Sequence, residues 1–91
     1  MLELKDNEKK SEFLSFCIES YKVKHHMKGK DTANLFKESG VINFLIDGYD
    51  MLHTQGKDYI IEEIEIFLRK RGYNSWYYIM EVVLLLMNLK S

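Results

Sequence analysis

The chain contains no proline and only one cysteine, Cys17, among its 91 residues. A single thiol excludes an internal disulfide, so a packed core must hold the fold together, and a reducing cytoplasm is the expected compartment. Cys17 has apolar neighbours on both sides in the sequence and is predicted to be a small buried side chain. Without proline, helix ends must be marked by glycine, which is typical of an all-helical domain.

Long apolar runs and an excess of one charge are also absent. Thirteen basic and fourteen acidic residues give a formal net charge of -1, which argues against a protein that wraps a nucleic-acid duplex, because phosphate contacts need a basic excess. The N-terminal sequence MLELKDNEKK lacks the apolar core of a signal peptide. No run reaches the roughly 18 apolar residues of a spanning helix. Neither secretion nor membrane insertion is expected.

Glycines and apolar periodicity predict one all-α domain over residues 1–91, a compact bundle of four to five helices. Residues 1–6 are expected to be disordered. The predicted helices span residues 7–26, 30–39, 41–54, 57–71 and 75–89. The glycines expected to end the first four are Gly29, Gly40, Gly56 and Gly72. Gly48 is expected to lie inside the third helix, at a point where another helix passes close.

Apolar residues recur at three- and four-residue spacing in the first four helices, which predicts one buried stripe on each. The predicted core residues are Phe13, Leu14, Cys17, Ile18, Tyr21, Leu35, Phe36, Val41, Phe44, Leu45, Tyr49, Leu52, Ile60, Ile64, Phe67 and Leu68.

Tyr49, Asp50 and His53 have the spacing at which helical side chains meet. A histidine oriented by an aspartate is half of an acid-base pair. However, no serine or cysteine is placed as a nucleophile, and no glycine-rich phosphate loop is present, so a small enzyme centred on His53 is not favoured. The preferred interpretation is that His53 ties down the turn before Gly56 by hydrogen bonds. A partner contact through Tyr49 and His53 is the second interpretation.

A basic cluster occupies the last turn of the first predicted helix and the residues that follow it. It consists of Lys22, Lys24, Lys28 and Lys30, together with His25 and His26. Adjacent histidines on a helix point about 100° apart and complete no recognised ligand spacing, so no metal or other cofactor is predicted. The cluster could dock an acidic surface or a nucleic-acid backbone. Residues 41–54, as the recognition helix of a helix-turn-helix, would need basic side chains, and this segment has no lysine or arginine.

The last predicted helix is apolar nearly all round and carries Glu81 as its only charge before Lys90. Such a helix must be covered either by the other four helices or by a second copy or a different protein. Its apolar stretch is shorter than the roughly 20 residues that span a bilayer, and it has no basic face for interfacial binding. Trp76, Tyr77 and Tyr78 beside methionine and leucine have the composition of an interface anchor. The segment 73–91 is therefore predicted to be core or interface.

The runs FLSFCIESYK and GKDTANLFKESGVINFLIDGYDMLHTQGKDYIIEEIEIFL resemble a family of small bacterial proteins known only as a domain of unknown function. The resemblance spans roughly Phe13 to Leu68 and rests on a spaced series of residues. The series comprises Gly29-Lys30, Leu35-Phe36, Gly40-Val41, Tyr49, Leu52-His53-Thr54, Gly56 and Tyr59-Ile60. Members of that family are often encoded beside a second small protein that looks like an ADP-ribosyltransferase-type toxin. The resemblance therefore implies an antitoxin or accessory-subunit role.

The residues and the resemblance together predict a non-enzymatic protein-interaction module, antitoxin-like or accessory to a small bacterial toxin encoded nearby. The candidate partner-binding residues are Tyr49, His53, Trp76, Tyr77 and Tyr78. The alternative is a homo-oligomeric regulatory or nucleic-acid-associated protein that uses Lys22, Lys24, Lys28 and Lys30. A homodimer stays open under both, while nucleic acid and membrane are not favoured as partners.

Overall fold

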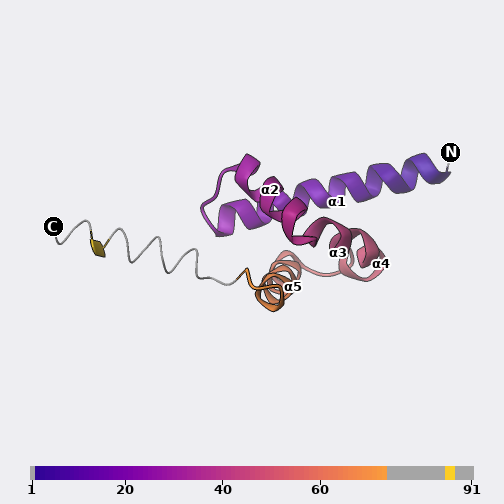
Figure 1. Cartoon of the computed structure of the whole chain (residues 1–91). Helices are drawn as coiled ribbons and strands as arrows, with labels where there is room; N and C mark the ends of the chain where they lie inside the picture. The colour runs from indigo at the N-terminus through magenta and orange to yellow at the C-terminus, as the bar shows by residue number, and fades with distance from the viewer. Residues whose placement is uncertain (1, 74–85, 88–91) are drawn as a thin grey trace.

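The computed structural model describes residues 2–73 and 86–87, with side chains described from residue 7 onward in the first range. Every regular element in these ranges is a helix, which confirms the prediction of an all-α domain. The helices are α1 (Leu2–Lys24), α2 (Gly29–Ser39), α3 (Val41–Asp47), α4 (Tyr49–Leu52) and α5 (Lys57–Lys70) (Figure 1). The predicted helix at 75–89 falls almost wholly outside the described residues, of which only 86 and 87 belong to it.

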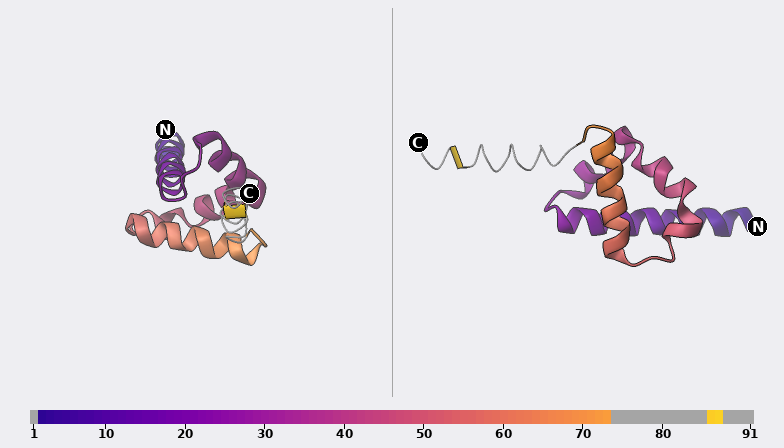
Figure 2. Two further views of the ribbon diagram at one scale, coloured as in Figure 1. Left: turned by 90° about the vertical axis from the view of Figure 1, so that its left-hand side faces the viewer. Right: turned by 90° about the horizontal axis from the view of Figure 1, so that it is seen from below.

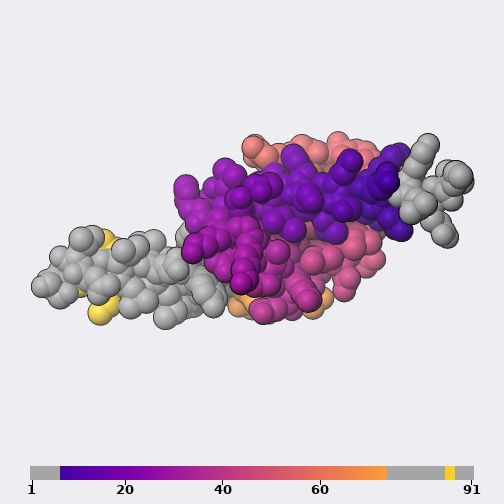
Figure 3. Space-filling view, turned by 90° about the horizontal axis from the view of Figure 1, so that it is seen from above, coloured from indigo at the N-terminus to yellow at the C-terminus, as the bar shows by residue number. Residues whose placement is uncertain are grey.

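The long helix α1 is the element on which the others assemble. It contacts α2, α3 and α5, and α3 in turn contacts α2, α4 and α5. Helix α5 runs across α1 (Figure 2), and the two ends of α5 emerge on opposite sides of α1 and α2 in Figure 3. This crossing brings residues near the end of α1 against the middle of a helix that lies far away in the sequence.

Helix α1 differs from its prediction at both ends. It begins at Leu2 and not near Asn7, so the helix includes residues 2–6. Glutamate, lysine and leucine form helices readily, and no stop signal separates these residues from the rest of α1. The helix ends at Lys24, five residues before the predicted breaker Gly29, which instead begins α2.

A histidine makes the turn that ends α1. His26 has a φ of 52°, its amide donates to the Val23 carbonyl at 3.4 Å, and the Met27 amide donates to the Lys22 carbonyl at 3.0 Å. These bonds form a Schellman motif, in which the left-handed residue is usually glycine. Gly72 takes the same place after α5, with a φ of 87° and a bond of 2.8 Å from the Tyr73 amide to the Leu68 carbonyl.

Glycines also separate the three central helices. Gly40, with a φ of 92°, forms the turn between α2 and α3, as predicted. Gly48 was expected inside one continuous helix, but it divides that helix into α3 and α4. The crowding at Gly48 comes from its own segment, because an added Cβ would lie 3.0 Å from Leu52 Cδ1 and 3.2 Å from the Phe44 carbonyl oxygen. No separate helix is needed to explain the glycine.

The residues that are buried in the structure include most of the predicted core residues. The buried apolar residues are Phe13, Cys17, Tyr21, Phe36, Val41, Leu45, Leu52, Ile60, Ile61, Ile64 and Leu68. Ile61 was not predicted, and it is buried because α5 presents a wide face to the helices it crosses. The remaining predicted core residues pack against this cluster but are only partly buried, namely Leu14, Ile18, Leu35, Phe44, Tyr49 and Phe67.

Two of the buried side chains are chemically informative. Cys17 is fully buried, as predicted, and this burial raises the pKa of its thiol to about 12. Thr32 is also fully buried, and its hydroxyl donates to the Lys28 carbonyl at 3.0 Å. This bond satisfies the hydroxyl without a partner from another helix.

Candidate functional site

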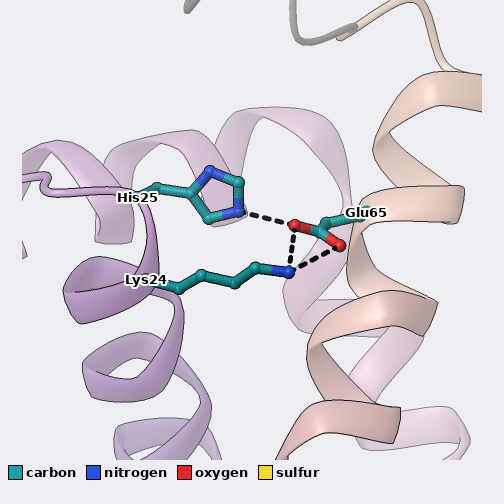
Figure 4. Close-up of polar contacts among 3 residues, drawn as sticks. All are labelled: Lys24, His25 and Glu65. Carbon is teal, nitrogen blue, oxygen red and sulfur yellow. Dashed lines mark hydrogen bonds and ion pairs between the residues drawn. The ribbon is translucent and has the colours of Figure 1, made fainter.

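Part of the basic cluster is used inside the protein. Lys24 Nζ lies 3.0 Å from one carboxylate oxygen of Glu65, and His25 Nε2 lies 2.8 Å from the same oxygen (Figure 4). Lys22 Nζ pairs with Glu19 at 3.1 Å. Lys28 and Lys30 are exposed and have no ion pair within the described residues. The cluster is therefore less available for an external partner than the sequence predicts.

The Glu65 contacts connect the end of α1 with α5. The His25 ring stacks on Tyr21 with ring centroids 4.0 Å apart, and Tyr21 in turn meets Phe36 of α2 edge-on at 5.2 Å. Aromatic packing thus holds the imidazole within reach of Glu65. The contacts of Glu65 with Lys24 and His25 therefore form a structural tie between the end of α1 and α5.

Tyr49 and His53 come together as the helical spacing predicts. Their rings stack with centroids 4.4 Å apart, and His53 Nδ1 donates to the Tyr49 carbonyl at 2.6 Å. Thr54 Oγ1 donates to the Met51 carbonyl at 2.8 Å. These bonds confirm that His53 ties down the turn after α4. In the described part of the chain Asp50 makes no bond to His53, so the two side chains are not held as an acid-base pair.

The Tyr49 ring also contacts the core, meeting Phe13 of α1 edge-on at 5.3 Å. His53 is exposed, while Tyr49 is partly buried. Part of the predicted partner surface is thus accessible. The other predicted anchors, Trp76, Tyr77 and Tyr78, lie outside the described residues.

A groove between α3 and α5 is a surface that the sequence did not predict. It encloses about 480 Å³, and its walls are Gly40, Asn43, Phe44, Asp47, Gly48, Phe67 and Arg71. Phe44 and Phe67 stack across the two helices with centroids 4.6 Å apart and form its apolar floor. Neither ring is fully buried, so an incoming apolar side chain can reach both.

Arg71 lies at one end of this groove. Its guanidinium carbon is 4.8 Å from the centre of the Phe67 ring, a geometry in which the ring face attracts the cation. The guanidinium lies beside Gly40, since a Cβ there would be in van der Waals contact with an Arg71 guanidinium nitrogen at 3.6 Å. Arg71 is exposed and has no ion pair with any described residue. Its charge therefore faces solvent above an aromatic floor.

The groove was missed because its residues belong to different predicted stripes. Phe44 and Phe67 were assigned to the core, and Arg71 is only the last residue of the predicted helix 57–71. The spacing of Gly40, Phe44 and Gly48 by four residues could have indicated an accessible stripe flanked by bare backbone. Which helix lies beside that stripe cannot be read from local spacing.

No helix in the described part of the chain is both long and apolar enough to cross a membrane. Nor do three or more metal-binding side chains gather anywhere among those residues.

Comparison with known proteins gives one family and no relative of known activity. No curated protein and no solved structure matches the chain significantly. A family model matches residues 12–71, which include α2 to α5, both Tyr49 and His53, and all the walls of the groove. The match covers well over half of the 91 residues, and the chain therefore belongs to the family described as protein of unknown function (DUF3791).

Proposed function

We propose that this protein is a non-enzymatic interaction module that serves as an antitoxin-like or accessory partner of a small bacterial toxin. The observation that carries the proposal is the groove between α3 and α5, with the stacked rings of Phe44 and Phe67 below the guanidinium of Arg71. Aromatic side chains and arginine are the residues that dominate protein–protein binding energies. A groove that presents both to solvent suits a protein partner.

The toxin is suggested by the family resemblance, since similar proteins are often encoded beside an ADP-ribosyltransferase-type toxin. In the proposed mechanism the module covers the active cleft of the toxin. The groove would supply the apolar anchor, and the exposed charges around it would steer the approach of the partner.

The experiment is co-expression of the tagged protein with the protein encoded next to it, followed by light scattering on a sizing column. A stable complex heavier than the 10.9 kDa chain by the mass of the neighbour is expected. Elution of the chain alone, or only as multiples of 10.9 kDa, would contradict the proposal.

A homo-oligomeric or nucleic-acid-associated role is the second candidate, and the exposure of Lys28 and Lys30 favours it. Binding to nucleic acid through these lysines should fall steeply with added salt because phosphate contacts release counterions. Replacing both lysines by glutamine should abolish such binding, whereas it should leave a complex formed through the groove unchanged.

A further inference from the structure

The groove between α3 and α5 has two different ends. Gly40, Phe44 and Gly48 follow one another at four-residue spacing along α3, so the stripe is about 12 Å long at the rise of an α-helix. Arg71 lies at the Gly40 end, and the Phe44 and Phe67 rings lie in the middle. Asp47 and Gly48 form the other end.

The two ends of the groove carry opposite charges. Arg71 and Asp47 are both exposed, and neither forms an ion pair with a described residue. They lie on opposite sides of the aromatic floor, about two helical turns apart along α3. The groove thus offers a positive group, an apolar floor and a negative group in sequence.

We propose that the groove binds an amphipathic helix of the partner protein, which places an acidic side chain on Arg71, a large apolar side chain on Phe44 and Phe67, and a basic side chain on Asp47. This inference rests on the proposed function and specifies the chemistry of the partner. On a helix, the three side chains would stand at positions i, i+4 and i+7, which share one face and span two turns.

Two features favour a helix as the occupant. A peptide that binds as an added β-strand needs a sheet edge for its backbone hydrogen bonds, whereas a helix satisfies its own, and every regular element in the described ranges is helical. The charged groups at the two ends, Arg71 and Asp47, also lie about two helical turns apart, which is the separation of side chains at i and i+7 on one face of a helix. A second copy related by a two-fold axis at the groove would instead place its own hollow against this one and leave the space between them unfilled.

The test uses synthetic helical peptides of about 18 residues, long enough to be partly helical alone. The first peptide carries glutamate, leucine and arginine at i, i+4 and i+7. Two control peptides carry either glutamate or arginine at both charged positions. Binding to the isotope-labelled full chain is followed by NMR, and the amides of Gly40, Phe44, Gly48 and Phe67 are expected to shift with the first peptide.

Charge-exchanged variants give the sharpest comparison. The wild type should bind the mixed peptide roughly fivefold more tightly than either control, a typical effect for accessible charge pairs. Arg71→Glu should reverse this preference toward the peptide with two arginines, and Asp47→Lys toward the peptide with two glutamates. Arg71→Gln, which adds no new charge, should only remove the preference for the mixed peptide over the peptide with two arginines.

Arg69→Glu is the matched control, because Arg69 is exposed two residues before Arg71, in the last turn of α5, but does not line the groove. It should leave the order of the three peptides unchanged, and all variants should keep the helical circular dichroism of the wild type. The proposal is overturned if the variants leave the peptide preference unchanged, or if the shifted amides lie away from the groove.

The other occupants would also be recognised. Groove amides that shift with protein concentration alone would identify a second copy. A change in Trp76 fluorescence on Arg71→Glu, without peptide binding, would identify the C-terminal segment of the chain itself. Either result overturns the partner-helix proposal.

The groove proposal and the toxin assignment can fail separately. Peptide binding without a complex with the neighbouring protein would remove the toxin assignment but keep the groove. If a complex with that neighbour forms but tolerates Arg71→Glu and Asp47→Lys, the toxin assignment stands and the groove is not the binding site.

Discussion

Two residues occupy strained or unusual positions. Burial disfavours ionisation of the Cys17 thiol, and the turn after α1 holds the backbone of His26 in a conformation that L-residues disfavour. The Cys17 thiol is enclosed by the core, where a thiolate would lose its hydration, and burial raises its pKa to about 12. His26 holds a left-handed backbone conformation that costs an L-residue with a Cβ roughly 1–2 kcal/mol. Both positions give direct predictions about stability.

Stability should fall at alkaline pH because of Cys17. The thiol pKa is raised from 9.0 to about 12 on folding, so between these values the unfolded chain loses the thiol proton and the folded protein keeps it. This proton stabilises the folded state below pH 9, and the contribution declines by up to about 1.4 kcal/mol per pH unit above it. Urea unfolding of the wild type and Cys17→Ala at increasing pH checks this. Parallel curves for the two proteins would contradict the prediction.

Replacing His26 by glycine should stabilise the protein. Glycine adopts a positive φ without steric cost, although it also makes the unfolded chain more flexible, so a net gain of roughly 0.5–1 kcal/mol is expected. His26→Ala is the control, since it removes the same imidazole but keeps a Cβ. Thermal unfolding should place the glycine variant above the alanine variant, and equal midpoints would show that the backbone is not strained.

At the scale of the elements, the sequence predicts the helical segments of the described residues and two of the four glycine ends, while Gly29 begins α2 and Gly56 precedes α5 as its N-cap. Gly40 and Gly72 were recognised because apolar periodicity stops just before them. The end of α1 was not recognised, since nothing in the sequence around His26 indicates a left-handed conformation and Gly29 was expected to end the helix. Gly48 was misjudged for a related reason. Helix propensity tolerates an internal glycine, and only the packing of Leu52 against it reveals why the segment divides there.

Gly48 should not accept a side chain. Alanine there would place a Cβ 3.0 Å from Leu52 Cδ1, and Leu52 is buried, so the core must shift. This strain should outweigh the better helix propensity of alanine and leave a net loss of about 1–2 kcal/mol. Gly29→Ala is the matched control, because its Cβ would meet only Lys22 Cδ at 3.7 Å. Chemical denaturation should show Gly29→Ala as neutral to stabilising, and a similar result for Gly48→Ala would contradict the packing argument.

At the scale of the whole molecule, the contacts that matter join residues far apart in the sequence. His25 meets Glu65 across 40 positions, and Phe44 meets Phe67 only because α5 lies beside α3. Spacing along the chain predicted the contact between Tyr49 and His53, which lie within one helical turn. It could not pair Glu65 with the basic cluster or assemble the groove, because both depend on how α5 crosses the other helices.

Removing the charge of Glu65 should loosen the contact between α1 and α5. Glu65→Gln is expected to lower the free energy of unfolding by about 1 kcal/mol, since the carboxylate receives both Lys24 and His25 and is only partly exposed. Glu62→Gln serves as the control, because Glu62 is exposed on the same helix. The difference between the two variants in urea should shrink at high salt. An equal effect of both substitutions would show that the tie contributes nothing specific.

Within the groove, the residue that the fold requires differs from the residues that carry the charges, and this has an evolutionary consequence. Gly40 sets the turn between α2 and α3 with a positive φ and also forms part of the groove wall, so a substitution there damages the fold together with the surface. Arg71 and Asp47 are exposed and support no other contact of the described core. Duplicated genes can therefore exchange these two charges, and so acquire new partners, while inheriting an unchanged scaffold.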